Sequence, residues 1–263
     1  MSAYYYLAKM KILVSLAYRF EVFINLGTNL ILMVASTFLW RAAYKGVDTV
    51  AGVNESQMIT YAMVSILITS FYNINVQYTL YRRIRQGDIA IDFFRPIKLL
   101  LCYFAEDIGQ SISSVVNKLL PLLVIMSAFI QIPAPAGFTA GLLFVLSTAM
   151  SFVILWLISA LIGVLCFWFV ELGNIDIIKD GILFLLSGRI IPLWLFPENI
   201  QNILKFLPFQ YIYQTPLSIF IGQLPLEQAG FTLLIQFTWI VILMLLLCFA
   251  WSKARKHISI QGG

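Results

Sequence analysis

The sequence predicts an all-α integral membrane protein with six membrane-spanning helices. Of its 263 residues, 61% are hydrophobic and only 11% are charged, whereas soluble domains average about 45–50% apolar and about 25% charged residues. The hydrophobic residues gather in long runs, and a bilayer-spanning helix needs roughly 20 such residues. These observations exclude an ordinary soluble enzyme, because one core could not bury this much apolar surface.

Six apolar runs are interpreted as spans of a single transmembrane domain over residues 1–263. In chain order they are residues 22–40, 58–80, 108–132, 138–170, 177–196 and 231–251. The fourth run is too long for one perpendicular span and too short for two, so a tilted helix is expected. The fifth run is interrupted by Gly188, Arg189 and Pro192.

Two further segments are predicted to be helical without crossing the membrane. Residues 1–21 carry Lys9 and Lys11 inside an apolar stretch led by tyrosines, which favours an interfacial helix over a secretory signal. Residues 197–230 are apolar but interrupted by prolines, so each piece is too short to span. Short outer re-entrant helices are expected there, since irregular backbone at membrane depth must be buried in protein or face water.

Basic residues predict the orientation. With the N-terminus inside, twelve of the seventeen Lys and Arg residues fall on the inner side and four on the outer side, while Lys118 lies within the third span. Because short loops rich in Lys and Arg stay in the cytoplasm, both termini are predicted to be cytoplasmic. The net charge of +5 is explained in this way, without nucleic acid as a partner.

Catalytic and metal-binding patterns are missing from the sequence. The one histidine lies in the basic C-terminal tail, and Cys102, Cys166 and Cys248 lie inside apolar runs, so no metal site and no catalytic residue is predicted. The phosphate-binding pattern G-x-x-x-x-G-K-[ST] does not occur, so the chain is not expected to bind ATP itself.

The segment 81–97, YRRIRQGDIAIDFFRPI, is the most informative stretch. Arginines combined with apolar side chains suit a helix that docks on a cytoplasmic partner, because Arg and aromatic residues dominate interface hot spots. The arginines alone equally fit a loop that anchors the second span. The candidate docking residues are Arg82, Arg83, Arg85, Gly87, Asp88, Ile91, Asp92, Arg95 and Pro96.

Four stretches give the chain a family resemblance along essentially its whole length. They are RRIRQGDIAIDFFRPIK at 82–98, GRIIPLWLFP at 188–197, LPFQYIYQTPLSIFIG at 207–222, and the basic tail that ends in Gly262 and Gly263. Together they resemble the permease subunits of type-2 ATP-binding-cassette exporters, and most closely the subfamily of viologen-exporter-like permeases.

The resemblance implies a transporter built from several chains in a bacterial inner membrane. Residues 82–96 would form the coupling helix that sits in a cytoplasmic ATP-binding subunit, of which two copies are expected. A second permease, identical or homologous, would complete the path, and ATP and Mg would be bound by the ATP-binding subunits. Residues 197–230 would cap the path at its outer end.

Residues within the spans are candidates for the translocation path or a gate. They are Tyr72, Asn73, Lys118, Arg189 and Pro192. For Lys118 the alternatives are snorkelling to the inner surface or pairing with Glu106, Asp107 or an acid of the loop 171–180. For Arg189 the alternative is snorkelling to the outer surface. Aromatic rings also serve as interfacial anchors.

The predicted function is ATP-driven export, as in multidrug efflux, of a hydrophobic or cationic drug, a peptide or a lipid. The alternative is an ATP-independent channel or secondary transporter. Against that alternative, the spans contain no acidic pair at mid-membrane and no matching inverted halves.

Overall fold

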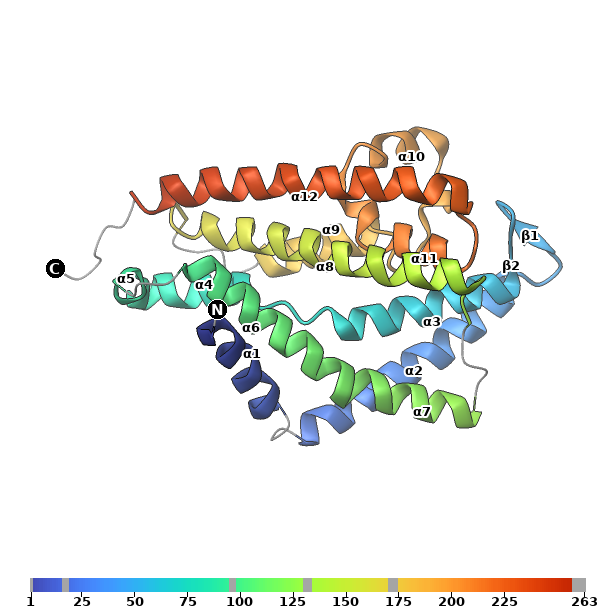
Figure 1. Ribbon diagram of the computed structural model, residues 1–263. Helices are drawn as coiled ribbons and strands as arrows, with labels where there is room; N and C mark the ends of the chain where they lie inside the picture. The colour runs from blue at the N-terminus through green and yellow to red at the C-terminus, as the bar shows by residue number, and fades with distance from the viewer. Residues whose placement is uncertain (1, 16–18, 95–97, 130–133, 170–174, 257–263) are drawn as a thin grey trace.

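The computed structural model describes residues 2–15, 19–94, 98–129, 134–169 and 175–256, and this part of the chain is mostly helical (Figure 1). The helices are α1 (Ser2–Ser15), α2 (Arg19–Ala43), α3 (Glu55–Phe71), α4 (Val76–Arg85), α5 (Asp88–Phe93), α6 (Leu99–Ser114), α7 (Leu120–Phe129), α8 (Phe138–Leu165), α9 (Ile175–Leu186), α10 (Glu198–Leu204), α11 (Gln214–Phe220) and α12 (Leu226–Ala254). A π-helical turn, Val115–Leu119, joins α6 to α7, and 3-10 turns cover Leu193–Leu195 and Pro208–Tyr211.

A short hairpin precedes α3. Strands β1 (Thr49–Val50) and β2 (Val53–Asn54) pair antiparallel, and the two turn residues Ala51 and Gly52 both have positive φ angles, which suits a tight hairpin turn. Asn54 then caps α3, because its side chain accepts a hydrogen bond from the backbone N–H of Gln57 and the Gln57 side chain accepts one from the backbone N–H of Asn54. This reciprocal capping box fixes where α3 begins.

Five helical stretches of the described chain are long and apolar enough to cross a membrane. They are residues 22–43, 55–85, 99–126, 138–165 and 226–254. The all-helical, multi-pass architecture expected from the sequence is therefore confirmed, whereas six spans are not. The third stretch begins at Leu99 instead of residue 108. The longer helix includes Glu106 and Asp107, which have partners inside the fold.

The fifth predicted span, 177–196, contains a short helix followed by irregular chain. Helix α9 has 12 residues, or about 18 Å at about 1.5 Å per residue, against a hydrocarbon core of about 30 Å. Helix α8 nevertheless ends at the same end of the molecule as α5, and α12 begins at the opposite end (Figure 1). The chain thus returns between the two ends through α9 and the short elements after it.

Helix α8 lies at the centre of the main core. Buried residues on α3, α4, α8, α11 and α12 form one apolar cluster, which includes Tyr61, Leu80, Ile154, Leu217 and Leu247. A smaller cluster joins α2 to α3 and α7. Most of the surface of α2 and α12 is exposed in the protein, as expected for helices that face lipid.

Buried polar contacts tie α12 to α8. The side chain of Gln236 is fully buried, and its amide nitrogen donates to the carbonyl oxygens of Ser147 and Tyr211 and to the hydroxyl oxygen of Ser151. The hydroxyl of Ser147 donates back to the amide oxygen of Gln236, over 3.0 Å. A polar side chain in an apolar span is thereby satisfied, and it sets the register between the two helices.

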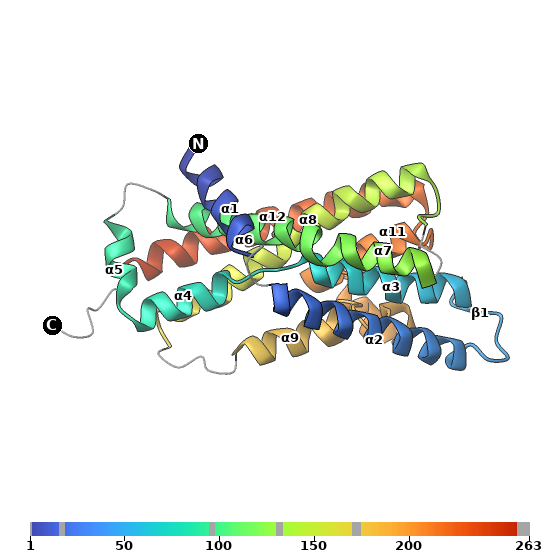
Figure 2. The ribbon, with the colours of Figure 1, turned by 90° about the horizontal axis from the view of Figure 1, so that it is seen from below.

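The two ends of the molecule differ in what they present. Helix α5 and the C-terminal end of α12 lie at one end, and the β1–β2 hairpin lies at the other (Figures 1 and 2). Helix α1 packs across α6, where Gly109 allows the backbone of Ala8 to approach closely. The predicted interfacial location of residues 1–21 stays a prediction.

Candidate functional site

Helices α4 and α5 form an angled arm, residues 76–93, which we call the α4–α5 arm. Helix α4 ends at Arg85, and Gly87 reverses the chain with a φ of 77°, a conformation that residues with a Cβ rarely adopt. Asp88 opens α5 and is half-buried, and a negative side chain is favourable at that end of a helix. The sequence Gln86-Gly87-Asp88 therefore produces the bend between the two helices.

An ion pair holds the two parts of the arm together. A guanidinium nitrogen of Arg83 on α4 lies 3.0 Å from a carboxylate oxygen of Asp92 on α5, and the Asp92 side chain is only 2% exposed. Sequence analysis placed both residues in the docking set. In the structure Arg83 and Asp92 contact each other. Their role inside the arm is therefore to hold α5 against α4.

Breaking this pair is expected to destabilise the protein more than removing an exposed arginine does. Arg83→Met leaves the buried carboxylate of Asp92 without this partner, whereas Arg82→Met changes an exposed side chain and should cost no more than about 0.5 kcal/mol. Combining Arg83→Met with Asp92→Leu should recover about 0.5–3 kcal/mol of the summed losses. Thermal unfolding of the single and double variants measures this coupling, and strictly additive losses would contradict the pair.

The outer face of the arm is both basic and apolar. Arg82 and Arg85 are exposed, and the Arg85 guanidinium donates to the Tyr81 hydroxyl over 2.6 Å. Ile91 and Phe94 are 63% and 90% exposed, and their spacing of three residues places them on the same side of the helix. We call these four residues the arm face.

Sequence analysis identified three members of the arm face and missed Phe94. The doublet Phe93-Phe94 carried the signal, but only the structure separates the two rings: Phe93 packs 5.6 Å from the ring of Trp251, while Phe94 points outward. The remaining predicted docking residues, Arg95 and Pro96, lie outside the described residues.

The second candidate span is broken between α3 and α4. Residues 72–75 are not helical, so four residues in the middle of this span expose backbone groups that need partners. Asp107 of α6 supplies two of them: one carboxylate oxygen accepts from the N–H of Asn75 and the other from the N–H of Val76, both over 3.1 Å. The second oxygen also accepts from the indole nitrogen of Trp156 on α8, over 3.0 Å.

Serines of α6 complete the set of partners. The Asn73 side-chain amide donates to the Ser114 hydroxyl over 3.1 Å, and Ser111 bonds to the backbone of Asn73. We call the break with Asp107, Ser111 and Ser114 the polar joint. It lies beside the π-helical turn 115–119, and such turns are frequent at functional sites.

Of the polar joint, Tyr72 and Asn73 were among the residues predicted from the sequence for the path or a gate, whereas Ser111 and Ser114 were not. Asp107 was considered only as a partner of Lys118. The available signal was polar residues recurring inside apolar runs, with Asn73 and Asn75 in one and Ser111, Ser113 and Ser114 in another. Only the packing of α6 against the break shows that the polar residues of one run form hydrogen bonds with those of the other.

Tyr72 connects the polar joint to the segment that contains Arg189. Its hydroxyl donates to the carbonyl oxygen of Ile212 over 3.2 Å, and its ring lies edge-on to that of Tyr213, 5.4 Å away. The Arg189 guanidinium lies 6.0 Å from the centre of the Tyr213 ring. Tyr72 and Arg189 are therefore brought to the same aromatic ring, although they are far apart in sequence.

The irregular chain around Gly188 is held by hydrogen bonds to α3 and α11. Gly188 has a φ of 79°, and its carbonyl oxygen accepts from the hydroxyl of buried Tyr61 over 2.5 Å. The Gln214 side-chain oxygen accepts from the N–H of Leu193 over 2.9 Å, next to buried Pro192. Pro192 starts the 3-10 turn, so its role in the structure is to redirect the chain.

Lys118 is not joined to these groups. It is half-buried on the π-helical turn, and two of the acids considered as its partners, Glu106 and Asp107, have other partners. Glu106 lies 3.3 Å from Lys11 of α1, and Asp107 accepts the hydrogen bonds of the polar joint. Within the described residues, no cluster of three or more His, Cys, Asp or Glu side chains could hold a metal ion.

Comparison with known proteins assigns the family. A protein-family model described as an ABC-2 family transporter protein matches residues 30–262. No curated protein and no solved structure matches the chain. The family match covers the arm, the polar joint and all of the candidate spans except residues 22–29 at the start of the first span. The chain therefore belongs to the ABC-2 family of transporter proteins as a membrane component that is not itself catalytic, a membership that implies a partner ATP-binding subunit.

Proposed function

We propose that this chain is the permease subunit of an ATP-driven exporter and that the α4–α5 arm is its coupling element. The observation that carries this proposal is the arm face, an exposed set of two arginines and two apolar side chains at the end of the molecule that α12 also reaches (Figure 2). Two ATP-binding subunits, which bind ATP and Mg, and a second permease, identical or homologous, complete the transporter.

The arm suits docking because its shape is set before a partner binds. The positive φ of Gly87 and the Arg83–Asp92 pair hold α5 at one angle to α4, and pre-organised elements lose less conformational freedom on binding. Ile91 and Phe94 offer exposed apolar anchors on the same arm as Arg82 and Arg85, the mixture that dominates interface hot spots.

Force on α5 would reach the spans through the polar joint. Helix α4 packs closely on α8 at Gly163, whereas its link to α3 is the non-helical segment 72–75. A break of this kind can absorb backbone rotation as a hinge. In this proposal the arm tilts at the polar joint when the ATP-binding subunits close, and α3 and the Tyr72–Tyr213–Arg189 group change position around the path.

The proposed substrate is a hydrophobic or cationic drug, a peptide or a lipid, exported across a bacterial inner membrane in the manner of the viologen-exporter-like subfamily. The proposed orientation has both termini in the cytoplasm. Support comes from the arm and the end of α12 lying at one end of the molecule, where Arg82, Arg85, Lys253, Arg255 and Lys256 are exposed, as the positive-inside rule requires for a cytoplasmic face.

Placing a charge on the arm face is expected to release the ATP-binding subunit. Ile91→Asp together with Phe94→Asp should weaken binding by about thirtyfold, equivalent to the roughly 2 kcal/mol of a hot spot. Co-purification of the ATP-binding subunit from native membranes, and ATPase activity in the purified complex, measure this loss. The matched control is Phe206→Asp, at a ring that is 78% exposed outside the arm.

The same preparation tests the alternative function. An ATP-independent channel or secondary transporter would move substrate with an ion gradient and without the ATP-binding subunit. If the arm-face variant kept both the subunit and its ATPase activity, the coupling role of the arm would be wrong.

A further inference from the structure

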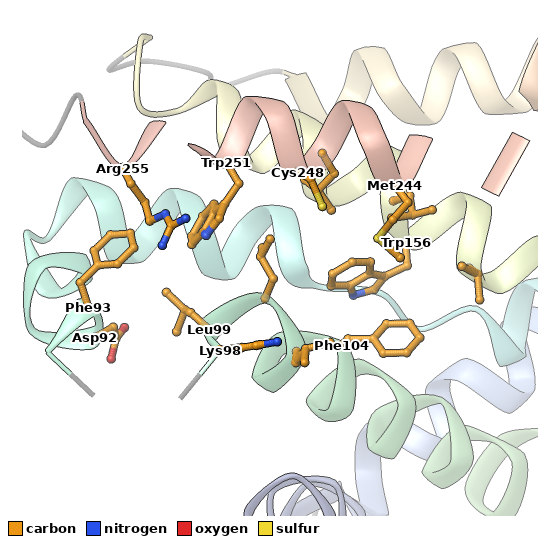
Figure 3. A pocket seen from close by; sticks show the side chains of 15 residues that line it. Asp92, Phe93, Lys98, Leu99, Phe104, Trp156, Met244, Cys248, Trp251 and Arg255 are labelled. Atoms are coloured by element: carbon orange, nitrogen blue, oxygen red, sulfur yellow. The ribbon is translucent and has the colours of Figure 1, made fainter. Parts of the chain in front are cut away.

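A groove between α6, α8 and α12 is not used by the proposed coupling. It has a volume of about 1070 Å³, at the upper end of the roughly 300–1,000 Å³ typical of ligand pockets. Its walls are mainly apolar and aromatic, with Leu99 and Phe104 from α6, Trp156 from α8 and Trp251 from α12 (Figure 3). Phe104 and Trp156 meet edge-to-face with their ring centres 4.9 Å apart.

The charged residues of the lining belong to the chain segments next to the α4–α5 arm. Lys98 directly precedes α6 and Arg255 directly follows α12. Arg255 lies beside Trp251, and the Lys98 side chain extends along the groove toward Phe104 (Figure 3). The third charged residue of the lining, Asp92, is held by Arg83 at 3.0 Å. The lining next to the arm therefore presents a net positive charge, and the rest of the groove, toward Val153 and Met244, is apolar.

We propose that this groove binds one anionic phospholipid of the leaflet on the side of the α4–α5 arm. The headgroup phosphate would lie between Lys98 and Arg255, and the acyl chains would lie along Phe104, Trp156 and Met244. Basic pockets between membrane helices near the cytoplasmic surface are suited to anionic headgroups. A cationic substrate is disfavoured by the same two bases.

The position of the groove gives the lipid a structural role. Asp92 and Phe93 of α5 and Trp251 of α12 belong to one wall, and the rings of Phe93 and Trp251 are in contact. A lipid bound there holds the arm against the end of α12. Its occupancy therefore adjusts how firmly the arm is held, independently of whether an ATP-binding subunit is docked.

The tryptophans of the groove provide the test. The full-length protein is placed in phosphatidylcholine nanodiscs that contain increasing fractions of brominated phosphatidylglycerol, or of brominated phosphatidylcholine as the comparison. The part of the tryptophan fluorescence quenching that is lost in Trp251→Phe measures brominated lipid bound in the groove. We expect this quenching to saturate at a much lower fraction of the anionic lipid than of the zwitterionic lipid.

Charge variants decide whether the groove causes the preference. Lys98→Gln with Arg255→Gln should reduce it by about fivefold to thirtyfold, since each base near an anionic lipid favours binding by roughly fivefold. Lys253→Gln with Lys256→Gln removes the same charge from exposed positions near the same helix end and should leave the preference intact. Soluble glycerol phosphate should not relieve the quenching.

Three results would overturn the proposal. Equal quenching by the two brominated lipids in the unaltered protein would show no preference for an anionic headgroup. An equal loss in both charge variants would show only a general surface charge. Relief by glycerol phosphate would show a phosphate site without a bound lipid.

Discussion

Asp107→Ala is expected to remove most of the stability that holds the second span to the third. The substitution leaves three donors without this acceptor: the buried N–H of Val76, the buried indole nitrogen of Trp156 and the part-buried N–H of Asn75. Each buried donor left unpaired costs about 1–3 kcal/mol, so the two buried donors alone cost at least about 2 kcal/mol. In lipid no water replaces the lost acceptor. Thermal unfolding of the purified protein in nanodiscs measures the loss.

A graded series isolates the cause. Trp156→Phe removes one of the three donors and should be the mildest change, although it also removes part of the ring contact with Phe104. Asp107→Asn keeps one acceptor oxygen and should fall between Trp156→Phe and Asp107→Ala. Glu106→Gln is the matched control, because its partner Lys11 is 46% exposed and such pairs contribute little, about 0–1 kcal/mol.

Ordering of the series is the deciding result. If Asp107→Ala and Glu106→Gln unfolded at the same temperature, the carboxylate would not be what satisfies the break. If Asp107→Asn retained full stability but lost substrate-stimulated ATPase activity in the complex, the polar joint would matter for coupling more than for folding. Both outcomes are distinguishable from the expected gradient.

Gly163→Val is expected to separate α4 from α8. A Cβ at Gly163 would lie 2.9 Å from the Cα of Gln77 and 2.9 Å from a methyl carbon of Leu80, so the two helices must move apart. Overpacking of this kind costs about 1–3 kcal/mol and sometimes more. We expect an unfolding temperature lower by several degrees and a loss of ATPase stimulation, because the displaced helix is the one that carries the arm.

The control for this substitution is Gly230→Val on α12. Gly230 is exposed and a Cβ there would meet nothing within 4 Å, so its effect should be small. Equal losses at the two glycines would show that a β-branched residue in a membrane helix is the cause, and would contradict the close approach of α4 and α8.

The docking segment shows how far the sequence could be interpreted. Its position and its arginines followed from the pattern of residues 81–97, whereas the structure divides the one helix expected there into α4 and α5 at Gly87. The division of labour within it did not follow. Arg82 and Arg83 are neighbours of the same type, yet Arg82 is exposed and Arg83 pairs with buried Asp92. Which arginine faces the protein depends on how α5 folds back on α4, a three-dimensional relation that adjacent letters do not encode.

The second and third spans show a different limit. The third span was predicted to start at residue 108, directly after Glu106 and Asp107, and an acid in a lipid-facing helix is unfavourable. In the structure the helix begins at Leu99, and Asp107 is tolerated because it meets exposed backbone N–H groups of the broken second span. Alone, the helix break leaves backbone N–H groups without acceptors, and the buried acid lacks donors. Together, each supplies the hydrogen-bond partners that the other needs.

The sequence by itself determined that this chain is a helical, multi-pass membrane protein, because the length of a hydrophobic run is a local property. It also located the basic segment between the second and third spans. Tertiary structure decided which side chains of the α4–α5 arm are exposed, how the break at residues 72–75 is satisfied, and where α6, α8 and α12 leave a groove lined by basic residues. These features depend on contacts between residues that are distant in the chain, and such contacts form only when the helices pack.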